Sequence, residues 1–308
     1  MYKLICGDAL LELKKIPDNS IDMVCTSPPY WCLRNYGVDG QFGLEKTPEE
    51  YVNKMVEVFR EVRRVLKKEG TLWLNLGDSY ATTKVGNTET RKNPNVVTNS
   101  FKKEKPNNLK PKDLVGIPWR VAFALQSDGW YLRQDIIWHK PNPMPESVTD
   151  RCTKSHEYIF LMAKSQHYYF NNEAIMEDSI WYSRDKRAIT GGITKSGKSI
   201  SEEGYQYQCN KLGSFSKISG KRNKRSVWIV TTKPFRGAHF ATFPEDLIKP
   251  CILAGCPKGG TILDLFCGAG TTGVVAKKNN RNFIGIELNP KYLEIAKKRI
   301  NNTQENML

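Results

Sequence analysis

The stretch TILDLFCGAGTTGVVAKKNNRNFIGIELN, residues 261–289, carries the strongest fold signal in this 308-residue chain. An apolar run leads into a glycine-rich turn, a helical segment follows, and a second apolar run ends at Glu287. Gly268, Gly270 and Gly273 satisfy G-x-G-x-x-G, the pattern of a tight strand-to-helix turn in nucleotide-binding folds. The stretch predicts a strand, turn, helix and strand that hold a cofactor; a tight turn without a ligand is the alternative.

Two features of this unit favour S-adenosylmethionine over NAD. Little sequence follows Glu287, so we expect the remaining strands of the sheet to come from earlier residues, in a permuted order. Asp264 places a carboxylate beside the turn, which suits a ligand with a cationic amino-acid group better than a pyrophosphate.

The rest of the chain alternates apolar runs with helical patterns, as expected for an α/β fold with a mostly parallel sheet. Residues 47–70 predict a helix that begins after Thr47, with Pro48 and Glu50 in its first turn and Gly70 as its stop. By the same reasoning we expect strands at residues 20–25, 71–76, 131–138 and 156–164, and a helix at residues 119–129.

The segment TSPPYW, residues 26–31, follows the first of these predicted strands. A serine, two prolines and two aromatic residues form a stiff corner. Taken alone, it indicates a rigid turn with a small aromatic cluster.

The charge of the chain is concentrated in two segments. The net charge is +15, of which residues 84–112 contribute +6 and residues 184–225 contribute +8. Both segments are rich in Gly, Ser and Asn, which indicates a surface that binds a polyanion such as nucleic acid. Disordered basic loops are the alternative.

Several classes of protein are disfavoured. No apolar run is long enough to cross a bilayer and the first residues lack the features of a signal peptide, so we expect a cytoplasmic protein without membrane contact. The eight cysteines include no C-x-x-C pair, which disfavours a zinc site, and we expect no metal.

Four motifs, in this order, resemble those of the β class of DNA amino-methyltransferases. They are GDAL (7–10), SPPY (27–30), HFATFPEDLIKP (239–250) and DLFCGAGTTG (264–273). The resemblance covers nearly the whole chain and implies a Rossmann-like, S-adenosylmethionine-dependent methyltransferase fold in permuted order, with the catalytic half first and the donor loop last. It implies a catalytic domain at residues 1–170 and 234–308, a target-recognition region at residues 171–233, and an additional basic loop at residues 84–112.

The resemblance also implies which residues form the site. The catalytic residues are Ser27, Pro28, Pro29 and Tyr30. The donor-binding residues are Asp8, Phe243, Asp264, Phe266, Gly268, Gly270 and Glu287.

The chemistry of an exocyclic amine explains why the corner is stiff. The lone pair of such an amine is delocalised into the base ring, so it must be freed and aimed. Ser27 and the carbonyl of Pro28 can accept hydrogen bonds from the two amino protons, and Pro29 adds no competing N–H donor. Tyr30 can stack on a base that has left the duplex.

The sequence favours N4-methylcytosine as the product and keeps N6-methyladenine as the alternative. In the family, serine at the position of Ser27 usually accompanies action on cytosine N4. Cytosine C5 chemistry is disfavoured, because Pro250-Cys251 continues with isoleucine rather than the usual glutamine. An RNA or protein methyltransferase and an inactive DNA-binding protein are further alternatives. We expect double-stranded DNA as the partner, a cognate restriction endonuclease as a further possible partner, and either a monomer or a dimer.

Overall fold

The computed structural model describes residues 1–33, 35–81, 109–178, 207–209, 215–217, 221–233 and 243–304. Most of both basic segments and residues 239–242 of the HFATFP motif lie outside this description. The chain divides into two compact units. The first combines Met1–Asn171 with Ser226–Leu308, and the second is Asn172–Arg225.

The first unit is built on an eight-stranded sheet with the order β1-β12-β11-β2-β3-β5-β4-β10. Only β5 runs antiparallel to its neighbours, so the predicted mostly parallel sheet is confirmed. The strands are β1 Tyr2–Cys6, β2 Ile21–Thr26, β3 Leu66–Leu76, β4 Tyr131–His139, β5 His156–Ala163, β10 Val227–Ile229, β11 Thr261–Asp264 and β12 Asn282–Glu287.

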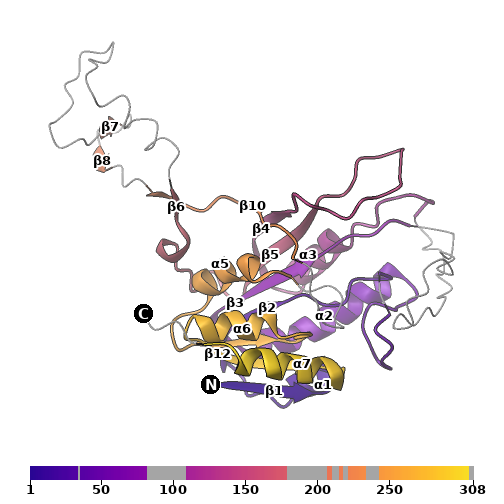
Figure 1. The fold of residues 1–308 in the computed structure, drawn as a ribbon, viewed down its shortest axis with the longest axis horizontal. Coiled ribbons are helices and arrows are strands. Elements are labelled where there is room, and N and C mark those ends of the chain that lie inside the picture. The colour runs from indigo at the N-terminus through magenta and orange to yellow at the C-terminus, as the bar shows by residue number, and fades with distance from the viewer. Residues whose placement is uncertain are drawn as a thin grey trace, which may run out of the picture. The chain divides into compact units, whose positions relative to one another are not determined.

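Helices cover both faces of this sheet. They are α1 Ala9–Leu13, α2 Pro48–Val65, α3 Ile117–Ser127, α5 Glu245–Gly255, α6 Thr271–Lys278 and α7 Pro290–Asn301. Helices α5, α6 and α7 contact one another in series across the near face in Figure 1, and α1, α2 and α3 form a second series. The chain passes from β2 through α2 to β3 toward one edge of the sheet, and from β11 through α6 to β12 toward the other. Because crossovers between parallel strands are right-handed, the two directions place α2 and α6 on opposite faces.

The junction between α2 and β3 differs from the prediction. Thr47 caps α2 as expected, its hydroxyl accepting a hydrogen bond from the Glu50 N–H at 3.1 Å. The helix ends at Val65 rather than near Gly70, because Leu66 already has extended backbone (ψ 138°) and pairs with Ile21. The strand predicted at 71–76 therefore begins five residues earlier, at Leu66.

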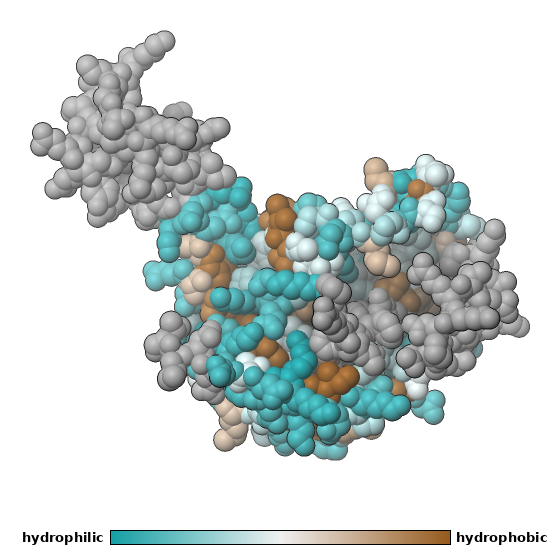
Figure 2. Space-filling model, in the orientation of Figure 1, coloured by the Kyte–Doolittle hydropathy of each residue, from teal (hydrophilic) through white to brown (hydrophobic). Residues whose placement is uncertain are grey.

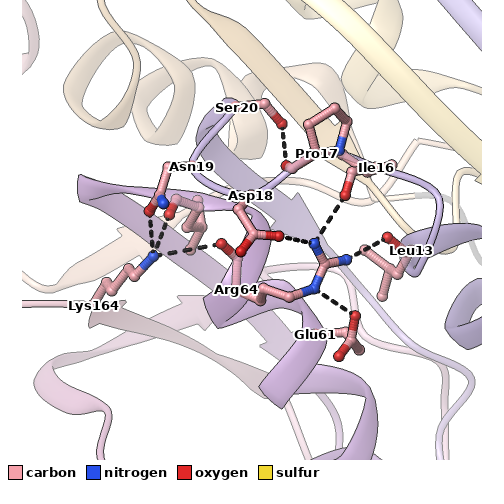
Figure 3. Close-up of polar contacts among 10 residues, drawn as sticks. Leu13, Ile16, Pro17, Asp18, Asn19, Ser20, Glu61, Arg64 and Lys164 are labelled. Atoms are coloured by element: carbon pink, nitrogen blue, oxygen red, sulfur yellow. Dashed lines mark hydrogen bonds and ion pairs between the residues drawn. The ribbon is translucent and has the colours of Figure 1, made fainter.

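A cluster around Arg64 lies at the end of the sheet where the central strand β2 begins (Figure 3). The Arg64 guanidinium donates to the carbonyls of Leu13 (2.8 Å) and Ile16 (3.0 Å) and pairs with the carboxylates of Asp18 and Glu61. Beside it, Lys164 Nζ donates to the Leu66 carbonyl at 2.6 Å. These bonds tie α1, α2 and β5 together at the end of β2 opposite Ser27.

The second unit contains short antiparallel pairs. Strand β6 Glu177–Asp178 pairs with β9 Lys221–Arg222, and β7 Tyr207–Cys209 pairs with β8 Phe215–Lys217; a short 3₁₀ helix, η2 Glu173–Ile175, precedes β6. Arg222 and Arg225 both form ion pairs with Glu177, at 3.0 and 2.6 Å.

The coloured part of the surface in Figure 2 is mainly hydrophilic, with small apolar groups set into it. Within the described residues, no helix is both long and apolar enough to span a membrane.

Candidate functional site: a pocket at the ends of β11 and β2

Strands β11 and β2 are parallel neighbours from which the chain departs in opposite directions. From β11 it passes through α6 to β12 on one side, and from β2 it passes through α2 to β3 on the other. In an open α/β sheet, ligands bind outside the carboxyl ends of the strands at such a switch point. The TSPPYW corner and the glycine-rich loop both begin there.

A pocket opens at this point, with about 860 Å³ of empty space that is partly open to solvent. Its walls come from the segments that follow β1, β2, β11 and β12, together with residues near α5 and α7. The pocket brings together most of the residues that the sequence singled out: Asp8, Ser27, Pro29, Phe243, Phe266, Gly268 and Glu287.

Glu287 joins three parts of the pocket wall. Its carboxylate accepts hydrogen bonds from the N–H of Gly268 at 2.8 Å and of Asn289 at 2.9 Å, and burial raises its pKa. Its own carbonyl accepts the Gly7 N–H at 3.0 Å. Each carboxylate oxygen keeps a lone pair for a further donor, so Glu287 can bind a hydroxyl in the pocket.

Asp8 serves both the fold and the pocket. Its Oδ1 atom accepts the Leu11 N–H at 2.9 Å and so caps α1. The residue also lines the pocket, where the rest of the carboxylate can accept a hydrogen bond.

Asp264 lies behind the pocket wall rather than on it, contrary to the direct contact with the donor that we expected. The residue is 1% exposed. Its oxygens accept hydrogen bonds from the hydroxyls of Thr26 (2.7 Å) and Thr272 (2.6 Å) and from the Phe266 N–H (3.2 Å). Burial raises its pKa to about 6, although these bonds oppose the shift. Asp264 therefore fastens β11 to β2 and to the first turn of α6.

Two glycines of the loop have different structural roles. Gly268 lines the pocket, whereas Gly270 lies outside the lining and precedes α6 with a φ of 76°. A Cβ atom on Gly270 would come within 2.8 Å of the Ala296 Cβ of α7. Gly270 therefore permits the turn and the close packing of α6 on α7.

The segment after TSPPYW supplies a wall that sequence reasoning missed. Tyr36 and Phe42 line the pocket. The Tyr36 ring packs edge-on against Tyr292 of α7 with centroids 6.5 Å apart, and the Phe42 ring against Phe266 with centroids 5.5 Å apart. Aromatic residues in an otherwise polar, glycine-containing loop were the available signal.

The two prolines differ in what their carbonyls contact. The Pro29 carbonyl accepts a hydrogen bond from the Tyr51 hydroxyl at 3.0 Å. Within the described residues, no group donates to the Pro28 carbonyl. Pro28 lies outside the pocket lining, and its carbonyl keeps both lone pairs, whereas the Pro29 carbonyl keeps one.

Tyr30 points away from the pocket lining into a polar cluster. Its ring packs against Gly77, where an added Cβ would come within 2.5 Å of the ring. Its hydroxyl lies 2.7 Å from Glu157 Oε2, 3.1 Å from Asn75 Oδ1 and 3.3 Å from Ser27 Oγ. Burial and the charge of Glu157 raise the tyrosine pKa, so the hydroxyl keeps its proton. Sequence reasoning singled out neither Asn75 nor Glu157.

In the part of the chain that the structure describes, His, Cys, Asp and Glu side chains form no group of three that could hold a metal.

Comparison with known proteins identifies the family. Residues 21–298 match the family described as DNA methylase. The Type II methyltransferase M.Cfr9I of Citrobacter freundii is 46% identical over 303 residues, which cover 98% of this chain and 88% of the relative. M.SmaI of Serratia marcescens is 45% identical over 301 residues, which cover 97% of this chain and 90% of the relative.

Two solved structures share the fold. The PvuII DNA methyltransferase, which is cytosine-N4-specific, gives a TM-score of 0.63 at 18% identity, over 100% of this chain and 89% of that chain. A DNA modification methylase of Thermus thermophilus, in complex with S-adenosyl-L-methionine, gives a TM-score of 0.60 at 22% identity, over 98% of this chain and 94% of that chain.

Proposed function

The chain belongs to the N6/N4 DNA methylase family, and we propose that it transfers a methyl group from S-adenosylmethionine to the N4 amine of a cytosine in duplex DNA. One observation carries the proposal. Ser27, the first residue of SPPY, lies on the wall of the same pocket as Gly268 and Glu287.

The lining of the pocket fits the chemistry of the donor. Phe42 and Phe266 offer apolar surfaces for an adenine ring, while Asp8 and Glu287 offer acceptors for its amine and for ribose hydroxyls. When bound, S-adenosylmethionine supplies an electrophilic methyl group, and its sulfur keeps the electron pair of the broken S–C bond.

Ser27 and Pro28 orient the amine. The Ser27 oxygen accepts a hydrogen bond from one amino N–H and the Pro28 carbonyl from the other, which turns the nitrogen lone pair away from both and toward the pocket. Tyr51 supports this assignment because its hydrogen bond takes one of the two lone pairs of the neighbouring Pro29 carbonyl. The rigid backbone of two successive prolines keeps the acceptors in place.

Cytosine is the proposed target, and adenine N6 is the second candidate. A serine hydroxyl both accepts and donates, so Ser27 can accept a hydrogen bond from the amine while its own hydroxyl donates to another group. The cytosine-N4-specific structural neighbour also supports cytosine. The family includes enzymes of both kinds. Adenine N1 is a ring acceptor beside the amine, as cytosine N3 is, so this feature of the base does not exclude adenine.

The basic segments are proposed to bind the DNA backbone. Residues 171–233 would form the target-recognition region, residues 84–112 a second contact, and residues 1–170 with 234–308 the catalytic domain. The relatives are named Type II methyltransferases, so a cognate restriction endonuclease in the same cytoplasm is the proposed companion.

Expression in a host free of DNA methylation tests this function. Sequencing of the host DNA with modified bases detected should reveal N4-methylcytosine at one recurring sequence. N6-methyladenine instead would move the assignment to the second candidate, and an unmodified genome from a host that contains the folded protein would contradict the function.

A further inference from the structure

A continuous set of polar contacts leads from the pocket wall into the protein. Ser27 Oγ lies 3.3 Å from Tyr30 Oη, and Tyr30 Oη lies 2.7 Å from Glu157 Oε2. Glu157 Oε1 forms a close ion pair with Lys140. These residues come from the corner after β2, from β5 and from the segment after β4, so the sheet itself brings them together.

The two hydrogen bonds that lead from Ser27 to Glu157 share one direction. The Ser27 hydroxyl donates to the Tyr30 oxygen, and the Tyr30 hydroxyl donates to Glu157. The lone pairs of the Ser27 oxygen are then available to an incoming amine. Each hydroxyl can therefore receive a proton on one side and release one on the other.

Asn75 fixes the geometry without being able to take the proton. Its Nδ2 atom donates to the Tyr158 carbonyl at 3.0 Å, which sets the orientation of the amide and turns Oδ1 toward Tyr30. A side-chain amide does not accept a proton at physiological pH. Glu157 is thus the group of the cluster that can hold one.

Three basic side chains lie around Glu157. Lys140 is held over the ring of Trp138, with Nζ 4.2 Å from the ring centroid. Lys154 and His156 also face this carboxylate; burial lowers the pKa of each, and the charge of Glu157 opposes both shifts. The side chain of Glu157 is 17% exposed, which leaves a way out to solvent.

We propose that Glu157 is the final acceptor of the proton that leaves the methylated amine, and that Ser27 and Tyr30 relay it. This rests on the proposed function. One N–H bond of the amine breaks and its proton joins the Ser27 oxygen. The Ser27 proton moves to Tyr30, and the Tyr30 proton moves to Glu157. Both hydroxyls are restored, the amine becomes neutral, and the carboxylate becomes a carboxylic acid that later releases its proton to water.

The relay keeps the amine neutral while it reacts. Removing a proton as the N–C bond forms prevents positive charge from building up on the base nitrogen. Serine alone cannot do this, because its hydroxyl must pass a proton on in order to receive one.

The test compares Glu157→Gln with Glu61→Gln. Both replace a carboxylate paired with a cation by an amide of the same shape, but Glu61 pairs with Arg64 near the start of β2, at the end of that strand opposite Ser27 (Figure 3). In single-turnover assays on duplex DNA, Glu157→Gln should slow transfer by about 100-fold, the lower end for general-base catalysis. Glu61→Gln should stay within about twofold, as for a surface substitution.

The pH profile separates a proton acceptor from a structural residue. The wild-type rate should fall at acid pH, because protonated Glu157 cannot accept, and Glu157→Gln should lose this acid limb. The affinities for donor and DNA should be unchanged in both variants. Glu157→Asp keeps a carboxylate and should keep the acid limb at a reduced rate.

An independent readout needs neither donor nor DNA. In protein labelled with ¹³C at the tyrosine Cζ atoms, the Tyr30 signal should shift in Glu157→Gln and stay in place in Glu61→Gln. An unchanged Tyr30 signal would contradict the hydrogen bond on which the relay depends.

The outcomes distinguish the relay from the proposed function. Wild-type protein that transfers no methyl group to duplex DNA would overturn the function. Active wild type with an undiminished rate and an intact acid limb in Glu157→Gln would overturn the relay alone. If Glu157→Gln fails to fold, a Glu157→Asp variant without an acid limb would overturn the relay.

Discussion

Replacing Asp264 by alanine should weaken the fold as well as the pocket. The substitution leaves three donors without an acceptor: the hydroxyls of Thr26 and Thr272 and the N–H of Phe266. Both threonines are buried. At about 1–2 kcal/mol for each stranded donor, the cost is about 3–6 kcal/mol.

Part of this cost is offset at neutral pH. The folded-state pKa of Asp264 is about 6, against an ordinary value of 3.8, so burying the ionised carboxylate costs about 3 kcal/mol at pH 7. Alanine removes that cost, which leaves a net loss of about 0–3 kcal/mol in the free energy of unfolding at pH 7.

The offset has a defined pH dependence. Because the folded pKa is raised, the contribution of Asp264 to stability is fully present below pH 3.8 and is lost as the pH rises through about 6. At pH 5 the burial cost is only about half its value at pH 7. The loss in Asp264→Ala should therefore be about 1.4 kcal/mol larger at pH 5 than at pH 7.

Urea unfolding at the two pH values measures these differences. Asp18→Ala is the matched control, because its carboxylate is 65% exposed and pairs with Arg64 at the surface, where such a pair contributes at most about 1 kcal/mol. Asp264→Asn, which keeps one acceptor oxygen, should bind S-adenosylmethionine within a few-fold of wild type. Unchanged stability of Asp264→Ala at pH 5, combined with loss of donor binding in Asp264→Asn, would refute the buried role of Asp264 and restore a direct contact with the donor.

Three further variants test the pocket and the basic cluster. Glu287→Gln removes an acceptor for Gly268 or Asn289 and should weaken donor affinity about 10-fold by calorimetry; equal affinity would contradict its place at the donor. Gly270→Ala should lower the free energy of unfolding by at least about 1–2 kcal/mol, because its φ is 76°; an unchanged urea midpoint would contradict this. Neutralising four basic residues should reduce the slope of log DNA affinity against log salt, by less than about 0.9 for each charge because two of them already pair with Glu177; an unchanged slope would mean that they do not meet phosphates. The four are Lys221, Arg222, Lys224 and Arg225.

The sequence predicted those features that depend on local pattern. The start of α2 follows from Thr47 and Pro48, and the turn between β11 and α6 follows from its glycines, because capping and backbone freedom are properties of neighbouring residues. The α/β fold followed from the alternation of apolar runs and helices.

Contacts between segments that are distant in sequence could not be predicted from local patterns. Asp264 was expected to face the donor, but Thr26, which lies far away in sequence, takes one of its oxygens across the junction of β11 and β2. Glu157 reaches Tyr30 only because β5 runs antiparallel beside β3. Neither contact can be predicted from the local sequence, because both depend on the order of the strands in the sheet.

Mass spectrometry of nucleosides from duplex DNA, treated with the protein and methyl-labelled S-adenosylmethionine, identifies the methylated base. With wild-type protein we expect label in N4-methylcytosine. With Ser27→Ala we expect much slower labelling but unchanged binding of donor and DNA, because that variant loses an acceptor for the amine and keeps the pocket. Label in N6-methyladenine with none in methylcytosine, or full activity in Ser27→Ala, would contradict cytosine N4 as the target or Ser27 as its acceptor.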